Sequence, residues 1–171
     1  MKVAYADPPY IGQAKKHYGQ FGGSEVDHAA LIARLNADYP DGWALSLSSP
    51  TLKQILALCP DDVRIAAWVK PFASFKPGVN PAYAWEPVIW RGGRQKRKRT
   101  EPTVRDWVAA SITMKRGMPG AKPDAFCFWL FDLLGLQPGD TLDDLFPGSR
   151  SVSRNWQRWQ GQLWHVEGAS A

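Results

Sequence analysis

Few residues in this sequence are suited to hold a metal ion or to form a covalent crosslink. Among 171 residues there are only two cysteines, Cys59 and Cys127, and three histidines. None of them lies at the short spacings that are typical of zinc sites. We therefore predict no metal site, and the scarcity of cysteine favours a reducing compartment.

Long apolar runs are also missing. No stretch approaches the roughly 20 residues of a membrane-spanning helix, and Met1-Lys2 leads directly into a short apolar segment rather than into a secretory leader. We expect a cytoplasmic protein with no membrane partner. Hydrophobic residues make up 44% of the chain, which is enough for one globular domain over 1–171.

Charge is unevenly distributed along the chain. The net charge is +5, and five of the six residues of the segment 94–99 are basic, so this run alone equals the whole excess. Such runs contact phosphates or remain as solvated loops. A glycine-punctuated loop after residue 10 carries two further lysines. We predict that the basic residues of both segments contact nucleic acid: Lys15, Lys16, Arg94, Lys96, Arg97, Lys98 and Arg99.

The most informative stretch lies near the N-terminus. Residues 3–6 read as a short buried strand that runs into Asp7-Pro8-Pro9-Tyr10. In open α/β sheets the carboxyl ends of strands bind ligands, and two consecutive prolines make the turn stiff and remove two backbone donors. The Asp7 carboxylate and the Pro8 carbonyl are suited to accept the two N–H groups of a planar amine, and Tyr10 to stack on its ring. The alternative is an ordinary turn with a surface tyrosine.

A second stretch of this kind follows in the C-terminal half. Lys122-Pro123 opens an apolar helix that ends near Gly135, and a strand over 141–146 then leads into a turn with Gly148 and Ser149. Glycine lets the backbone approach a ligand closely, and the N-terminus of the next helix offers N–H groups to a carboxylate. The alternative is again an ordinary turn.

Strand and helix patterns alternate along the chain. We predict strands at 3–6, 43–48, 63–69, 85–91, 141–146 and 163–167. We predict helices from a cap at Ser24 or Asp27, and over 49–58, 103–114, 125–134 and 151–159. This order predicts an α/β fold with a largely parallel sheet.

The two stretches together resemble the amino-group methyltransferases, which use S-adenosylmethionine to methylate adenine N6 or cytosine N4. The resemblance implies a Rossmann-like sheet, mostly parallel with an antiparallel edge hairpin, with helices on both faces and a trimmed C-terminus. It also implies a permuted order, with the catalytic motif before the cofactor loop. Asp7 and the Pro8 carbonyl then hold the target amine, Pro9 shapes the turn, and Tyr10 stacks on the flipped base.

The same resemblance implies how the cofactor is held. Lys70 and Glu86, at the ends of the hairpin strands, are expected to face the site. Arg150 stands where the family has a second glycine, which is expected to narrow the pocket or to change the turn. The residues implied to bind the cofactor are Lys122, Asp144, Phe146, Gly148, Ser149 and, after the last strand, Glu167.

The expected activity is methylation of adenine N6 in DNA, with S-adenosylmethionine as cofactor, by a protein of bacterial or phage origin. Cytosine N4 as target, RNA as substrate, a nucleic-acid-binding relative without the cofactor, and one subunit of a larger methylase remain as alternatives. Target recognition is expected from residues 72–120, from a second copy, or from a partner subunit. Cytosine C5 chemistry requires a nucleophilic cysteine, and neither cysteine lies near the motif turns.

Overall fold

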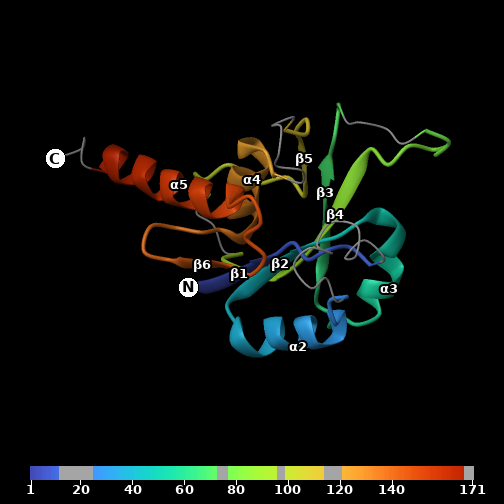
Figure 1. Cartoon of the computed structure of the whole chain (residues 1–171). Helices are drawn as coiled ribbons and strands as arrows, with labels where there is room; N and C mark the ends of the chain where they lie inside the picture. Colours follow the sequence, from blue (N-terminus) through green and yellow to red (C-terminus); the bar gives the residue numbers. More distant parts are fainter. Residues whose placement is uncertain (12–24, 73–76, 96–98, 114–120, 168–171) are drawn as a thin grey trace.

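The computed structural model describes residues 1–11, 25–72, 77–95, 99–113 and 121–167, and within these ranges it does not describe the side chains of 162–167. The predicted nucleic-acid contacts Lys15, Lys16, Lys96, Arg97 and Lys98 lie outside the described residues. The chain forms one six-stranded sheet with helices on both faces, α4 and α5 on one and α2 and α3 on the other (Figure 1). In chain order the elements are β1 (Lys2–Ala6), α2 (His28–Asp38), β2 (Gly42–Ser46), the 3-10 turn η2 (Ser49–Thr51), α3 (Leu52–Leu56), β3 (Arg64–Val69), β4 (Trp85–Gly92), β5 (Trp107–Ala109), α4 (Asp124–Leu134), β6 (Thr141–Asp144) and α5 (Ser151–Glu167).

The strand order is β5-β3-β4-β2-β1-β6. β1 pairs in parallel with β2 and β6, and β3 pairs in parallel with β5, whereas β4 is antiparallel to both β2 and β3. Five strands therefore point the same way, and β4 alone is reversed. The predicted fold class is confirmed: the sheet is mostly parallel, and the β3–β4 hairpin lies towards one side with the short β5 outside it.

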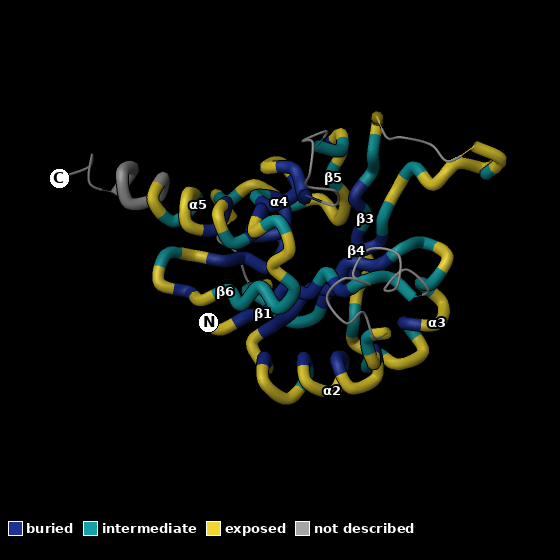
Figure 2. Tube along the Cα trace, viewed as in Figure 1, coloured by how far each residue is buried: buried dark blue, intermediate teal, exposed yellow. Residues whose placement is uncertain are grey.

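Strand β1, which lies between β2 and β6, shows why the sheet is covered on both faces. Val3 and Tyr5 pack into the apolar cluster beneath α4 and α5, whereas Ala4 and Ala6 pack into the cluster with α2 and α3. All four side chains are almost completely buried, which is why β1 reads as a continuous apolar run rather than an alternating one. Figure 2 shows this buried centre between helices whose outer sides are exposed.

Local sequence signals placed most helix boundaries correctly. Asp27 caps α2, because its carboxylate accepts a hydrogen bond from the Ala30 N–H at 2.9 Å. Gly135 ends α4 with a φ of 64°, the left-handed conformation that favours glycine.

Two predicted elements are wrong. The described part of the predicted helix over 103–114, residues 103–113, is instead irregular chain around β5, because Trp107, Val108 and Ala109 pair with the edge of β3. The predicted strand over 163–167 is the last part of α5, which continues through Gly161. An internal glycine costs a helix only about 1 kcal/mol, so it did not end this one.

Residues 72–120, predicted to serve target recognition, include β4 and β5, and both belong to the central sheet. Over the described residues, no helix combines the length and apolarity needed to cross a membrane.

Candidate active site

The two predicted motif turns leave the sheet side by side. β1 and β6 are parallel neighbours in which Tyr5 pairs with Asp144, and the Leu145 N–H donates to the Tyr5 carbonyl at 2.9 Å. The turn Asp7–Tyr10 and the loop Leu145–Arg150 therefore start from adjacent positions on one edge of the sheet. The carboxyl ends of β2 and β3, and the start of the reversed β4, lie at this same edge, which we call the carboxyl edge.

A buried network of four charges lies against the first turn. The Lys122 ammonium is 3.2 Å from Asp7 Oδ1 and 3.2 Å from Glu86 Oε2, and the Lys70 ammonium bonds Glu86 Oε1. Lys122 is only 6% exposed. Two cations and two carboxylates thus alternate and cancel in charge, as buried charges require. Lys70 and Glu86, expected to face the site, are both part of this network.

Tyr10 is tied to the same network. Its hydroxyl donates to Glu86 Oε2 at 2.8 Å. Burial, followed by the nearby carboxylates of Asp7 and Glu86, raises the pKa of Tyr10 well above its usual value. The phenol therefore stays protonated and keeps donating at physiological pH.

The two carboxylates of the network are compensated to different degrees. Burial raises the pKa of Asp7, and Lys122 offsets this only in part, so the pKa remains above its ordinary value. Burial also acts on Glu86, but Lys122 and Lys70 together with the hydrogen bonds from Lys70 and Tyr10 outweigh it and lower that pKa. Burial disfavours the Lys122 ammonium, yet Asp7 and Glu86 raise its pKa. The incompletely compensated carboxylate is the one on the Asp-Pro-Pro-Tyr turn.

The predicted cofactor loop has an unpaired acceptor at its start. Asp144 Oδ2 accepts from the Ser153 hydroxyl at 2.8 Å, but the buried Oδ1 has no hydrogen-bond partner in the described part of the chain. Burial raises the pKa of Asp144 despite the bonds from Ser153 and the Phe146 backbone. A buried acceptor without a donor is costly, so this oxygen is suited to a ligand that brings one.

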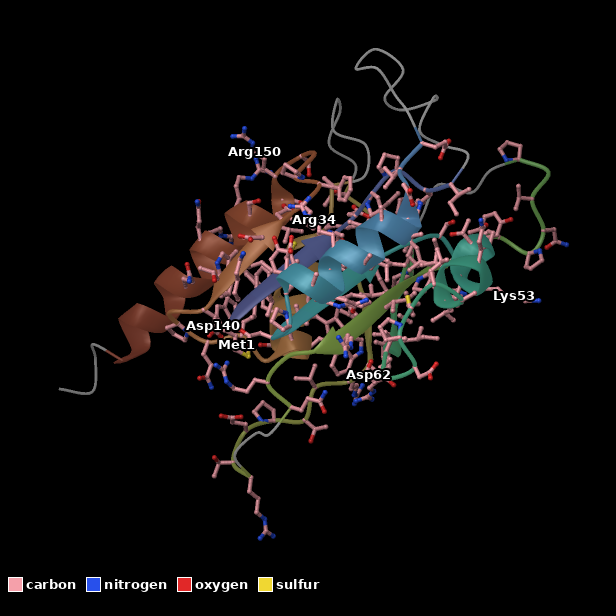
Figure 3. All side chains as sticks on the ribbon, turned by 90° about the horizontal axis from the view of Figure 1, so that it is seen from below. Met1, Arg34, Lys53, Asp62, Asp140 and Arg150 are labelled. Carbon is pink, nitrogen blue, oxygen red and sulfur yellow. The ribbon has the colours of Figure 1, made fainter. Side chains whose placement is uncertain are left out.

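The turn after Phe146 keeps the shape expected of a glycine-rich loop. Gly148 has a φ of 41°, and a Cβ placed there would approach only the Phe146 carbonyl, at 3.8 Å, so the loop surface is open. Arg150 has a φ of 57° and is the non-glycine residue with positive φ within the described ranges. It thus adopts the left-handed conformation that a glycine would favour, and its exposed side chain points away from the protein (Figure 3).

Two residues predicted to bind the cofactor occupy unexpected places. The Lys122 side chain contacts Asp7 and Glu86 rather than the cofactor loop, although the Lys122 backbone N–H donates to the Ser151 hydroxyl at 3.1 Å. Glu167 ends a helix, so the strand that was the basis for its ribose role does not exist.

Arg94 lies at the opposite, amino edge of the sheet. Its guanidinium donates to the Gly135 carbonyl at 2.6 Å and to Asp140 Oδ2 at 3.0 Å. This gives Arg94 a structural role, and the predicted nucleic-acid contact is not carried forward. Arg99 lies in an exposed turn.

The sequence interpretation missed two residues at the carboxyl edge, Trp68 and Ser153. The Trp68 ring lies beneath both lysines, with the Lys70 and Lys122 ammonium groups 4.8 and 5.0 Å from its centroid, a distance at which a cation is attracted to the ring. Ser153 holds Asp144. Trp68 lies on β3, and Lys70 directly follows the last residue of this strand. Because side chains two positions apart on an extended chain share a face, the position of Lys70 would have identified Trp68.

The described residues give little support to catalysis by a cysteine nucleophile or by a bound metal ion. Burial raises the pKa of Cys59 to about 11 and that of Cys127 to about 12, so both thiols stay protonated at neutral pH. Of the residues that the structure describes, no group of three or more histidine, cysteine or acidic side chains is arranged to hold a metal ion.

Comparison with solved structures identifies the fold. The crystal structure of the M1.HpyAVI–SAM complex superposes with a TM-score of 0.60 and 16% sequence identity, covering 92% of this chain and 78% of that one. That of M1.HpyAVI gives a TM-score of 0.58 and 14% identity, over 93% and 76% of the two chains. Neither the scan against protein-family models nor the search of curated proteins found a match. On the structural likeness, the chain has a methyltransferase fold.

Proposed function

We propose that this protein transfers a methyl group from S-adenosylmethionine to the N6 amine of adenine in DNA. The observation that carries the proposal is the adjacency of the two motif turns. The Asp7–Tyr10 turn and the loop that follows Asp144 leave neighbouring parallel strands whose residues Tyr5 and Asp144 are paired. A group that binds an amine and a group that binds the methyl donor would therefore meet at one edge.

The residues of the first turn account for the handling of the amine. Lys122 engages Asp7 Oδ1, which leaves Oδ2 as the acceptor for one amine N–H, and the Pro8 carbonyl accepts the other. These two bonds direct the nitrogen lone pair along one line. Because no covalent intermediate is needed, catalysis rests on positioning and electrostatics. Tyr10, with its hydroxyl held by Glu86, provides the stacking face for a base flipped out of the duplex.

The second turn fits the cofactor. The unpaired Asp144 Oδ1 would accept a donor from it, and Phe146, Gly148 and Ser149 would line its loop, where the Gly148 backbone is open to close approach. When bound, S-adenosylmethionine supplies an electrophilic methyl group on a sulfonium. The crystal structure of one structural neighbour, M1.HpyAVI, is a complex with SAM, which supports S-adenosylmethionine as the cofactor.

The test is a methylation assay with labelled S-adenosylmethionine and pools of duplex and single-stranded oligonucleotides, followed by nucleoside analysis. We expect N6-methyladenine in duplex DNA. Asp7→Asn should lower kcat by about 100-fold or more, the usual effect of removing one preorganised group. Asp38→Asn, an exposed α2 acid paired with Arg34, is the matched control and should retain full activity.

The outcomes separate the alternatives. N4-methylcytosine as the product would move the target to cytosine and keep the site. Full activity in Asp7→Asn would overturn the site assignment. A folded protein that shows neither methylation nor calorimetric binding of S-adenosylmethionine would overturn the proposed function.

A further inference from the structure

An unbroken chain of polar contacts joins the two ends of the Asp-Pro-Pro-Tyr turn. Asp7 contacts Lys122, Lys122 contacts Glu86, and Glu86 accepts from the Tyr10 hydroxyl. The two outer residues are three positions apart in sequence. The two inner ones come from the start of β4 and from the residues before α4.

The turn has little means of fixing itself. Pro8 and Pro9 carry no N–H, so they cannot hold the turn by backbone donation. Proline fixes φ but leaves the Asp7 carboxylate and the Tyr10 ring free to rotate about their own side-chain torsions. Among the residues that the structure describes, the polar side-chain contacts that orient them come from Lys122 for Asp7 and from Glu86 for Tyr10.

We propose that Lys122 and Glu86 act together as positioning residues for the amine-binding turn. Lys122 fixes the Asp7 carboxylate, Glu86 fixes the Tyr10 ring through its hydroxyl, and the contact between them keeps the two orientations matched. This inference rests on the proposed function and deepens it, because it moves Lys122 from the cofactor side of the site to the amine side.

Stability alone does not explain this pair. Buried ion pairs are often no more stable than apolar side chains of the same size, and this network contains two lysines and two carboxylates at the end of an otherwise apolar core. Preorganisation explains it better, since a base that enters a preset site pays less ordering entropy. Lys70 contributes by holding the other oxygen of Glu86, which leaves Oε2 aligned between Lys122 and Tyr10.

The Lys122 backbone also connects the turn to the second half of the site. Its backbone N–H donates to the hydroxyl of Ser151. Ser151 is the first residue of α5, the helix that follows the predicted cofactor loop. One residue thus contacts the amine turn through its side chain and the loop side through its backbone. A substitution of the side chain should therefore affect the amine turn and leave the loop contact in place.

The kinetic test is a double-mutant cycle between Lys122→Met and Tyr10→Phe. Each single variant should lower kcat about tenfold and change the Kd for S-adenosylmethionine less than twofold. The double variant should be no slower than Lys122→Met alone, because the Tyr10 hydroxyl helps only while Glu86 is held. Arg91→Met, which breaks an ion pair with Asp62 at the amino edge, is the control and should leave kcat unchanged.

A second readout does not depend on activity. In protein labelled with carbon-13 at tyrosine Cζ, Tyr10→Phe identifies the Tyr10 resonance by its loss. That resonance should shift in Lys122→Met and in Glu86→Gln. The second variant preserves side-chain size, so it keeps the test available if Lys122→Met does not fold. It should stay in place in Arg91→Met.

The two readouts distinguish the two hypotheses. If the wild-type protein methylates nothing but the Tyr10 resonance shifts as expected, the proposed function fails and the positioning pair stands. An unmoved resonance in the folded variants would overturn the pair, as would additive losses in kcat. A loss confined to the Kd for S-adenosylmethionine would return Lys122 to the cofactor side.

Discussion

The two ends of strand β6 carry the same residue type in opposite situations. Asp140, just before the strand, lies at the amino edge of the sheet, and Asp144, its last residue, lies at the carboxyl edge. Asp140 accepts from Arg94 at 3.0 Å, from the Gln137 N–H at 2.8 Å and from the Met1 α-ammonium at 2.5 Å. Figure 3 shows Met1 and Asp140 next to each other. Burial tends to raise the pKa of Asp140, but these bonds outweigh it and lower that pKa.

Asp144 has one side-chain donor, Ser153, and a buried oxygen without a partner among the described residues. Its pKa is raised by burial, and so is that of Asp7 at the same edge. The chain therefore satisfies the Asp140 carboxylate fully where the fold is closed, and it leaves Asp7 and Asp144 short of donors where a ligand is expected. Glu86, at the same carboxyl edge, is compensated by Lys122 and Lys70. Perturbed carboxylates such as Asp7 and Asp144 are typical of functional sites.

The largest expected effect on stability is that of Asp140→Asn. It removes one partner of a buried ion pair, and we expect a loss of about 3 kcal/mol in the free energy of unfolding. For a chain of this size this is roughly 6–12 °C in Tm. Because the pKa of Asp140 is lowered by folding, its stabilisation is present above the ordinary aspartate pKa of about 4 and is lost as pH falls through the folded value.

Thermal unfolding of wild type and Asp140→Asn between pH 3 and pH 8 tests this. The difference in Tm should be full at neutral pH and should close towards pH 3. A constant difference across this range would mean that the ionised carboxylate is not what Asp140 contributes. Methylation activity measured below both Tm values should be unchanged.

The contrast between the two edges also shows which parts of the molecule were predictable. Five of the six strands and the two motif turns were predicted, because apolar runs and proline or glycine punctuation are local signals. Lys70 and Glu86 were expected at the carboxyl edge from the resemblance to the amino-group methyltransferases. The role of Arg94 was not, because a charge run gives composition only and its partner Asp140 is 46 residues away. The direction of the Lys122 side chain was missed for the same reason. Its partners Asp7 and Glu86 are distant in sequence, and only the pairing of the strands brings them close to Lys122.

Asp144→Asn should have the opposite stability effect to Asp140→Asn and a smaller size. A neutral side chain in this place avoids burying an incompletely paired charge, so the free energy of unfolding at neutral pH should stay equal or rise by up to about 1 kcal/mol. Because the pKa of Asp144 is raised by folding, the wild type regains this difference as pH falls and the carboxylate is protonated. The difference in the free energy of unfolding between wild type and Asp144→Asn should therefore close at low pH because the wild type becomes relatively more stable, whereas with Asp140→Asn it closes because the wild type loses its advantage.

The same variant sharpens the functional half of the comparison. If Asp144 Oδ1 is an acceptor for the cofactor, the Kd for S-adenosylmethionine should rise about tenfold in Asp144→Asn, equal to about 1.4 kcal/mol for one charge-assisted bond. Isothermal titration calorimetry of both aspartate variants checks this, with Asp140→Asn expected to bind as the wild type does. Equal affinities for all three proteins would remove Asp144 from the cofactor site.

The smallest expected effect concerns the turns that flank β6. The turn before the strand has Gly139 at a φ of 86°, whereas the loop after it has Arg150 at a φ of 57°. A left-handed conformation costs a residue with a side chain about 1–2 kcal/mol, and glycine avoids this cost but gains entropy in the unfolded chain. Arg150→Gly should therefore raise the free energy of unfolding by only about 0.5 kcal/mol.

Gly139→Ala is the matched control for this prediction. A Cβ at Gly139 would meet nothing within 4 Å, so the substitution changes backbone preference alone and should lower the free energy of unfolding by about 1 kcal/mol. Chemical denaturation of the two variants measures both shifts. If Arg150→Gly instead destabilises the protein, the arginine side chain contributes more than its backbone strain costs, and the carboxyl edge keeps a non-glycine residue there for its contacts. If Arg150→Gly raises the free energy of unfolding and Gly139→Ala lowers it, then of these two turns the one with Arg150 carries the backbone strain. This turn lies at the carboxyl edge, where the incompletely paired carboxylates also lie.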